Sequence, residues 1–179
     1  MEIYEIKRGK QMILDMMPLL CGEKNKIEFE FSYVPDKSGA LCQTFSDIDF
    51  SSPVKVSGYV KSMAGYMFLH EDIHVEYSTA CARCAEPVDG KMELSFEKDI
   101  ADESVSEDND DYIFLEDKKL DLIDPTEEEL MLELPSKTLC REDCAGLCVK
   151  CGKNLNLGKC SCKQSEGDPR LQILKTLLK

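Results

Sequence analysis

The sequence has 179 residues, enough for one domain with a small appendage and a modest hydrophobic core. Its net charge of −13 argues against a protein that binds nucleic acid non-specifically over its whole surface. No run approaches the about 18 apolar residues of a membrane span, so we expect no membrane-spanning helix.

Alternation of apolar and polar residues predicts strands through most of the first hundred residues. In chain order, strands are expected over 1–7, 27–33, 53–61, from 66 to about Cys81, and over 91–97. Turns are expected at 62–65 and 87–90, which makes the last three strands an antiparallel meander with one face in water. The segment 35–50 has no sustained period and is expected to be a loop.

The middle of the chain is strongly acidic. Between Glu97 and Glu133 there are 16 acidic and 3 basic residues, a local balance of −13, so the rest of the chain sums to zero. We expect residues 101–111 to form a solvated acidic loop. A short helix should begin at Asp124, which can cap it, and end at Pro135. A last helix is expected from Asp168.

Eight of the ten cysteines have the spacing of metal ligands. Six lie between Cys140 and Cys162 in the pattern C-x3-C-x3-C-x2-C-x8-C-x-C, and a C-x2-C pair lies upstream. Eight thiolates make two four-sulfur shells, which suits two structural zinc ions. The candidate ligands are Cys81, Cys84, Cys140, Cys144, Cys148, Cys151, Cys160 and Cys162. Cys21 and Cys42 remain, and we expect them to be small buried hydrophobic residues.

Disulfides and an iron–sulfur cluster are the alternatives to zinc. The first residues, Met1–Glu5, show neither the basic nor the apolar region of a secretory signal, so we expect a cytoplasmic protein. Thiols stay reduced in the cytoplasm, which favours metal binding over disulfides.

Spacing leaves two groupings of the eight sulfurs open. In the favoured grouping, Cys148, Cys151, Cys160 and Cys162 form one local shell, and Cys81 and Cys84 join Cys140 and Cys144 in the other. The competing grouping places Cys140, Cys144, Cys148 and Cys151 together, and the remaining four in the second shell.

One motif is misleading. His70-Glu71-Asp72-Ile73-His74 matches the H-E-x-x-H pattern of zinc peptidases, which needs a helix to bring both histidines to one ion. The surrounding residues predict a strand, where four residues span roughly 13 Å. A metal held by four sulfurs also has no open position for hydrolysis. We therefore expect no enzyme and no small-molecule substrate.

Several motifs together resemble the YceD family of large ribosomal RNA subunit accumulation proteins. They are C-A-R-C-A-E-P-V from Cys81, D-P-T-E-E-E-L from Asp124, and G-L-C-V-K-C-G-K-N-L-N from Gly146. The resemblance covers roughly the last 100 residues. It implies a bacterial cytoplasmic factor for the accumulation or processing of 23S ribosomal RNA in large-subunit assembly.

The expected fold is α+β: a predominantly antiparallel sheet, either a meander or barrel-like, with two short helices and a carboxyl-terminal zinc knuckle. Residues 1–135 would form the body with its acidic loop and one helix. Residues 136–179 would form a zinc-binding tail with the last helix, stapled to the body.

Two functions remain open. In the first, basic residues of the tail contact ribosomal RNA or a large-subunit precursor particle. These residues are Arg141, Lys150, Lys153, Lys159 and Lys163. In the second, the acidic middle binds a basic ribosomal protein as a chaperone or adaptor, without contact to RNA.

Overall fold

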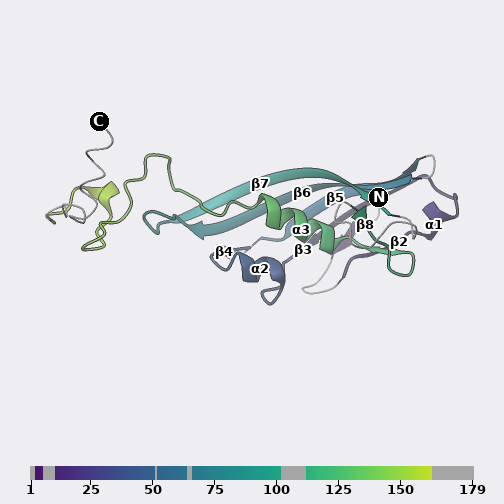
Figure 1. Cartoon of the computed structure of the whole chain (residues 1–179), viewed down its shortest axis with the longest axis horizontal. Helices are drawn as coiled ribbons and strands as arrows, with labels where there is room; N and C mark the ends of the chain where they lie inside the picture. Colours follow the sequence, from purple (N-terminus) through teal and green to yellow (C-terminus); the bar gives the residue numbers. More distant parts are fainter. Residues whose placement is uncertain (1–2, 6–10, 51, 64–65, 102–111, 163–179) are drawn as a thin grey trace, which may run out of the picture.

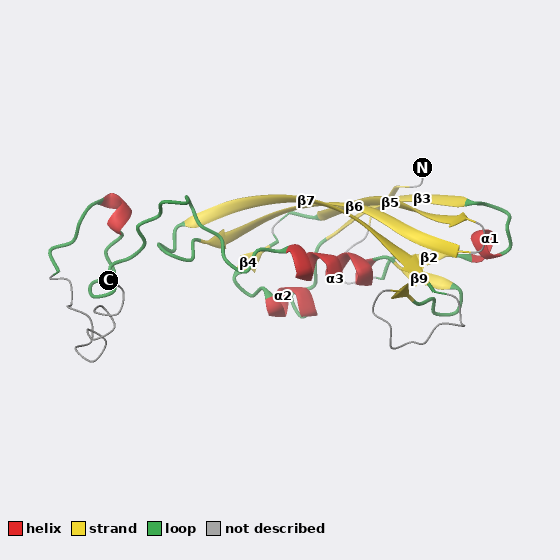
Figure 2. Ribbon diagram, turned by 45° about the horizontal axis from the view of Figure 1, so that its top comes forward, coloured by secondary structure: helices red, strands yellow, loops and turns green. Residues whose placement is uncertain are grey.

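A curved β-sheet forms the body of the protein, and a cysteine-rich lobe extends beyond one end of it (Figures 1 and 2). The computed structural model describes residues 3–5, 11–50, 52–63, 66–101 and 112–162. The elements are β1 (Ile3–Glu5), β2 (Ile13–Asp15), α1 (Met17–Leu20), β3 (Lys26–Tyr33), α2 (Ala40–Thr44), β4 (Ile48–Asp49), β5 (Val54–Met63), β6 (Tyr66–Ala80), β7 (Pro87–Ile100), β8 (Tyr112–Ile113), β9 (Lys119–Asp121), α3 (Ile123–Glu133) and the 3-10 turn η1 (Leu155–Leu157).

The main sheet has the strand order β1-β3-β5-β6-β7-β8, and β4 also pairs with β6. The strands from β3 to β7 pair antiparallel, while β1 and β8 add to the two edges in parallel. A separate antiparallel pair joins β2 to β9. The predicted α+β fold with an antiparallel meander is therefore confirmed.

One face of the sheet is apolar because the side chains alternate along each strand. A single row across four strands shows the register: Phe31 pairs with Val56, Val56 with Ile73, and Ile73 with Leu94. Helix α3 lies along this face and adds Leu130 to the same core (Figure 2). The opposite face remains wet, as expected.

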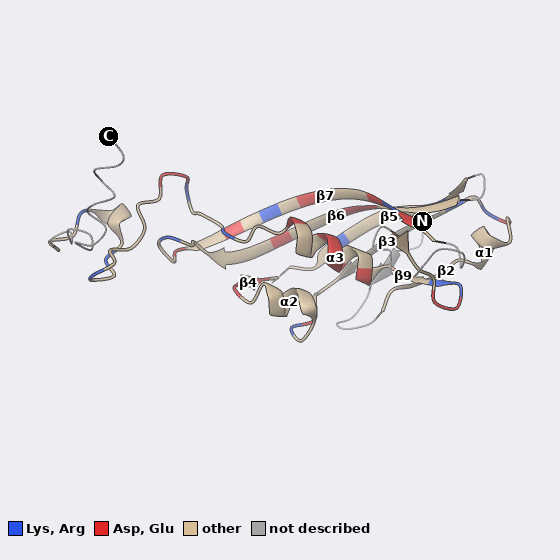
Figure 3. Cartoon of the chain, viewed as in Figure 1, with Lys and Arg blue, Asp and Glu red and all other residues tan. Residues whose placement is uncertain are grey.

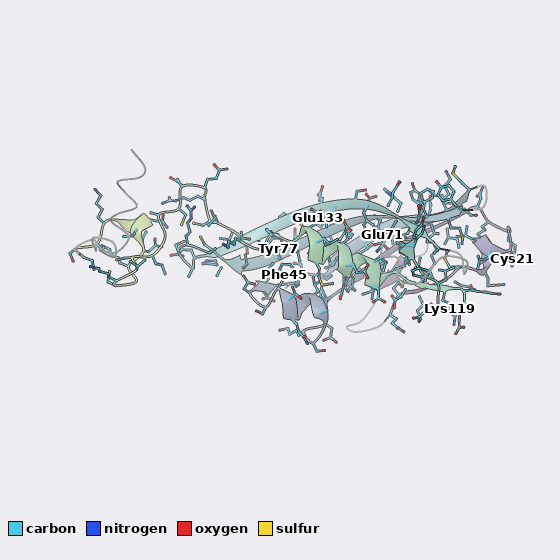
Figure 4. All side chains as sticks on the ribbon, viewed as in Figure 1. Cys21, Phe45, Glu71, Tyr77, Lys119 and Glu133 are labelled. Atoms are coloured by element: carbon cyan, nitrogen blue, oxygen red, sulfur yellow. The ribbon has the colours of Figure 1, made fainter. Side chains whose placement is uncertain are left out.

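A buried polar pair lies within this core. Glu71 of β6 points between the sheet and α3 (Figure 4), where its Oε2 is 2.7 Å from the Thr126 hydroxyl. The same hydroxyl lies 2.7 Å from the Leu122 carbonyl oxygen. Burial raises the pKa of Glu71 to about 8, against the lowering effect of Thr126. A protonated Glu71 can donate to Thr126, which leaves the Thr126 proton free to donate to Leu122.

Three local predictions are wrong. Residues 35–50 are not simply a loop, since they contain α2 and β4. Residues 87–90 do not turn, because β7 already begins at Pro87 and the chain reverses over 81–86. Cys21 is exposed rather than buried, whereas Cys42 is half-buried against the core.

The start of α3 also differs from the prediction. The helix begins at Ile123, and the Asp121 carboxylate, not that of Asp124, accepts a hydrogen bond from the Ile123 amide at 3.0 Å. The helix ends before Pro135 as expected, with Leu134 as its C-cap. Of the acidic loop expected over 101–111, only Ala101 belongs to the described residues, and it is buried. The expected helix from Asp168 also lies outside the described residues.

Candidate metal centre

The cysteines gather into two tetrads, in the favoured of the two groupings. Within each tetrad the four sulfur atoms all lie within 4.8 Å of one another. The first tetrad consists of Cys81, Cys84, Cys140 and Cys144, and the second of Cys148, Cys151, Cys160 and Cys162. Among the described residues, these two tetrads are the groups of three or more potential metal ligands whose ligand atoms all lie within 4.8 Å of one another.

The first tetrad joins the end of the sheet to the chain that follows α3. Cys81 and Cys84 lie in the connection between β6 and β7, where the Cys81 amide donates to the Glu86 carbonyl at 2.8 Å. Cys140 and Cys144 belong to residues 136–162, which we call the cysteine lobe. Three of the four cysteines are buried, and Cys140 is exposed.

The second tetrad is built within the lobe itself. Residues 148–152 form a tight turn, in which the Gly152 amide donates to the Cys148 carbonyl at 2.8 Å. Gly152 has a φ of 70°, a left-handed conformation that favours glycine. After η1 the chain returns through Cys160 and Cys162, so one short loop supplies all four sulfurs.

The sulfur separations match a tetrahedral metal site. Cys81 and Cys144 Sγ are 3.8 Å apart, Cys84 and Cys140 Sγ 3.6 Å, and Cys148 and Cys160 Sγ 3.4 Å. A tetrahedron with a zinc–sulfur bond of about 2.3 Å has sulfur–sulfur edges of about 3.8 Å. All ten cysteines are free thiols. The donor set and its geometry therefore fit two metal ions.

Backbone amides prepare one thiol in each tetrad for metal binding. The amides of Cys140 and Arg83 lower the pKa of Cys81 to about 6. In the second tetrad the amides of Cys151 and Lys150 lower the pKa of Cys148 to about 6. Both are the first cysteine of a C-x2-C turn that supplies amides to its own sulfur, and at Cys81 the amide of Cys140, from the other half of the tetrad, has the largest effect. These thiols favour the thiolate form, which is the form that binds metal.

The two tetrads are tied together by two residues that are not metal ligands. Arg83, between Cys81 and Cys84, donates from Nη1 to the Cys144 carbonyl at 3.0 Å, and its own carbonyl accepts from the Leu147 amide at 2.9 Å. Asn156 donates from Nδ2 to Cys144 Sγ at 3.3 Å. Sequence spacing did not identify Arg83 or Asn156, although both belong to the motifs that carry the family resemblance.

The basic residues of the lobe have mixed environments. Arg141 donates to Asn156 Oδ1 at 2.8 Å and lies 3.3 Å from Asp143 Oδ1. Lys153 and Lys159 come together, since Lys153 Nζ donates to the Lys159 carbonyl at 3.1 Å. Both lysines are exposed, as is Lys150, while Lys163 lies outside the described residues.

The H-E-x-x-H motif lies on a strand, as predicted. His70 and His74 belong to the wet face of β6, where His70 stacks on Tyr59 with ring centroids 4.9 Å apart. Glu71 points to the opposite, buried face. The three side chains therefore do not form the peptidase site that the motif suggests.

A family model described as "Large ribosomal RNA subunit accumulation protein YceD" matches residues 69–178. The chain belongs to the YceD family. All eight cysteines of the two tetrads fall within the matched region, together with α3 and most of β6.

Relatives of this YceD-family chain occur in bacteria and plants. YlbN of Bacillus subtilis is 30% identical over 156 residues, which cover 86% of this chain and 90% of YlbN. A Mycobacterium tuberculosis protein is 37% identical over 78 residues, 40% of this chain and 37% of that protein. The maize protein named large ribosomal RNA subunit accumulation protein YCED homolog 1, chloroplastic, is 26% identical over 144 residues, 63% of this chain and 49% of its own length.

The match thus spans little more than a third of the mycobacterial relative and about half of the maize protein. No solved structure matches the chain. Among the described residues, none of the helices has the length and apolar character needed to cross a bilayer.

Proposed function

We propose that the protein is a non-enzymatic zinc-binding factor of the cytoplasm that supports 23S ribosomal RNA accumulation and processing during large-subunit assembly. The observation that carries this proposal is the pair of four-sulfur tetrads inside the region matched by the YceD family model. The family name supplies the link to ribosomal RNA, and the tetrads supply the physical basis of a stable binding module.

Zinc is the metal that this donor set favours. Four thiolates in a tetrahedron suit zinc, and they fill all four of its positions. No position then remains for a water molecule or a substrate, so the role of the ion is structural. Each zinc with four thiolates carries a net charge of −2, which the basic residues of the lobe offset in part.

In this proposal residues 1–135 form the body and residues 136–179 form the zinc-binding tail. The first tetrad takes two sulfurs from each part, and a zinc ion there would hold the tail against the end of the β6–β7 hairpin. Binding energy at such a site is folding energy for the segments that it joins. We therefore expect a loaded first tetrad to hold the tail more firmly in its orientation on the body.

The lobe is the proposed RNA-contacting surface. The basic residues that we assign to this contact are Arg141, Lys150, Lys153 and Lys159 of the lobe, and Lys163 directly after it. Val149 and Leu157 of the lobe also expose their side chains to solvent. Lysines beside exposed apolar groups can contact phosphates while the apolar groups contact bases or a neighbouring protein.

The test is co-sedimentation with large-subunit precursor particles, combined with cross-linking to 23S ribosomal RNA. Lys153, Lys159 and Lys163 are changed together to Gln, and the expected result is a loss of several-fold in both signals. A matched control changes the exposed body residues Lys24, Lys37 and Lys55 to Gln, with the same change in net charge. Arg141 is tested separately as Arg141→Lys, because its contact with Asn156 also supports the lobe.

Equal loss in the control would mean that net charge, not the lobe, drives the association. An association that survives nuclease treatment unchanged would contradict contact with RNA.

A further inference from the structure

A groove runs beside α3 on the body of the protein, apart from the cysteine lobe. It has a volume of about 850 Å³ and lies between α3 and the short strands β2, β8 and β9. Neither tetrad contributes to it, so it is separate from the candidate metal centre.

The groove offers apolar side chains to solvent. Leu132 of α3 is 77% exposed and Ile13 of β2 is 50% exposed. Ile113, Phe114 and Met131, which are half-buried, continue the same lining. Leu132 lies with Asp124 and Glu128 on the exposed side of α3, so it extends the apolar lining of the groove to solvent. An exposed apolar patch with a polar rim is typical of a contact surface.

Carboxylates surround this apolar lining. The groove is lined by five acidic residues, Glu116, Asp117, Asp121, Asp124 and Glu128, and by two lysines, Lys98 and Lys119. Figure 3 shows acidic residues on α3 and in the loop beside β9.

These carboxylates are only partly neutralised. Lys98 Nζ lies 3.0 Å from Glu128 Oε2, and Asp121 Oδ1 accepts from the backbone amides of Met12 and Ile123. Burial and the neighbouring carboxylates of Asp121 and Glu128 raise the pKa of Asp124. Asp124 therefore faces negative charge, and a cation placed in the groove would be attracted to it.

We propose that this groove binds a basic peptide segment in which an apolar side chain lies between lysines or arginines. The apolar residue would cover Leu132 and Ile13, and the cations would pair with Asp124, Glu128 and Glu116. Nucleic acid and anionic membranes carry the wrong charge for this rim. The inference needs neither metal at the tetrads nor RNA at the lobe, so it can fail without affecting either.

Fluorescence anisotropy with a labelled synthetic peptide, Lys-Leu-Lys-Lys-Leu-Arg, tests the proposal on the full-length, zinc-loaded protein. The double change Asp124→Asn with Glu128→Gln should weaken binding at least tenfold, and Leu132→Ser should weaken it several-fold. The control, Glu28→Gln with Glu30→Gln, removes the same charge from the wet face of β3 and should leave binding within twofold.

The same peptide with both leucines replaced by serine should bind at least fivefold more weakly. Circular dichroism and metal content verify that each variant keeps the fold. The proposal is overturned if the groove variants bind like wild type, if the control loses as much affinity as they do, or if no saturable binding occurs.

Discussion

Asn156 holds Cys144 and the chain beside it in place through both ends of its amide group. Its Nδ2 donates to Cys144 Sγ at 3.3 Å, and its Oδ1 accepts from the Ala145 amide at 2.8 Å. Asn156 belongs to η1, which lies between the two halves of the second tetrad. A residue positioned by the second tetrad therefore supports a ligand of the first, and its hydrogen bonds favour the thiolate form of Cys144.

Asn156→Asp should weaken metal binding at the first tetrad. The carboxylate keeps the acceptor oxygen but loses the N–H that donates to sulfur, and it adds a negative charge beside thiolates. Loss of such a supporting contact typically costs 10- to 100-fold in metal affinity. Zinc release to a chromogenic chelator should become faster for one of two ions. Asn25→Asp, an exposed change in the body, is the control, and equal release from Asn156→Asp and wild type would contradict the role assigned to Asn156.

Glu71 should make stability depend on pH. Its pKa is about 8 in the folded protein, above the ordinary value of 4.5, because burial disfavours the charged form. The folded state therefore binds this proton more tightly than the unfolded state. The contribution to stability is full below about pH 4.5 and is lost as pH rises through about 8.

Glu71→Gln removes this titration while keeping a donor for Thr126. From pH 6 to pH 9, the free energy of unfolding of the variant should rise relative to that of wild type, by at most on the order of 3 kcal/mol. Urea unfolding at both pH values, with equal metal loading, gives the comparison. Glu30→Gln on β3 is the matched control. A parallel pH response of Glu71→Gln and wild type would show that Glu71 does not titrate in the folded protein.

Gly58 should not tolerate a side chain. A Cβ atom there would lie 2.1 Å from the His70 carbonyl oxygen and 3.0 Å from Phe29 Cζ. The first contact is with backbone, so β5 and β6 would have to separate locally. Gly58→Ala should therefore lower the free energy of unfolding by about 1–3 kcal/mol or more, as measured in urea. Ser57→Ala, at an exposed position of the same strand, should change it by less than about 0.5 kcal/mol.

The strands were predictable because their signal is local. In β3, for example, Phe29, Phe31 and Tyr33 alternate with polar residues, and a strand buried on one face requires that pattern. The turn at 87–90 was predicted wrongly because packing within the sheet, and not a turn, requires glycine at position 90. A Cβ at Gly90 would lie 2.4 Å from Tyr77 Cζ, so glycine here makes room for a ring on the neighbouring strand. The requirement for glycine thus comes from a contact between neighbouring strands, which the local sequence pattern does not reveal.

The metal ligands could also be predicted from the sequence, but their division between two sites could not. The C-x2-C spacing indicates which cysteines can share an ion, but two groupings satisfied it equally. The structure separates them because Cys140 and Cys144 come back to the β6–β7 connection, where the Ala82 amide donates to the Thr138 carbonyl at 2.9 Å. The burial of Glu71 could not be predicted from the H-E-x-x-H pattern in which it lies. Its contact with Thr126 depends on the position of α3 in the fold.

Metal content per chain tests the central claim most directly. Wild-type protein, Cys84→Ser and Cys160→Ser, purified without added metal, are analysed by mass spectrometry for zinc and other metals. We expect two zinc ions in wild type and one in each variant, with the double variant retaining none. Folded wild-type protein that contains no metal and is unaffected by chelators would contradict the account, as would loss of the same single ion from both variants.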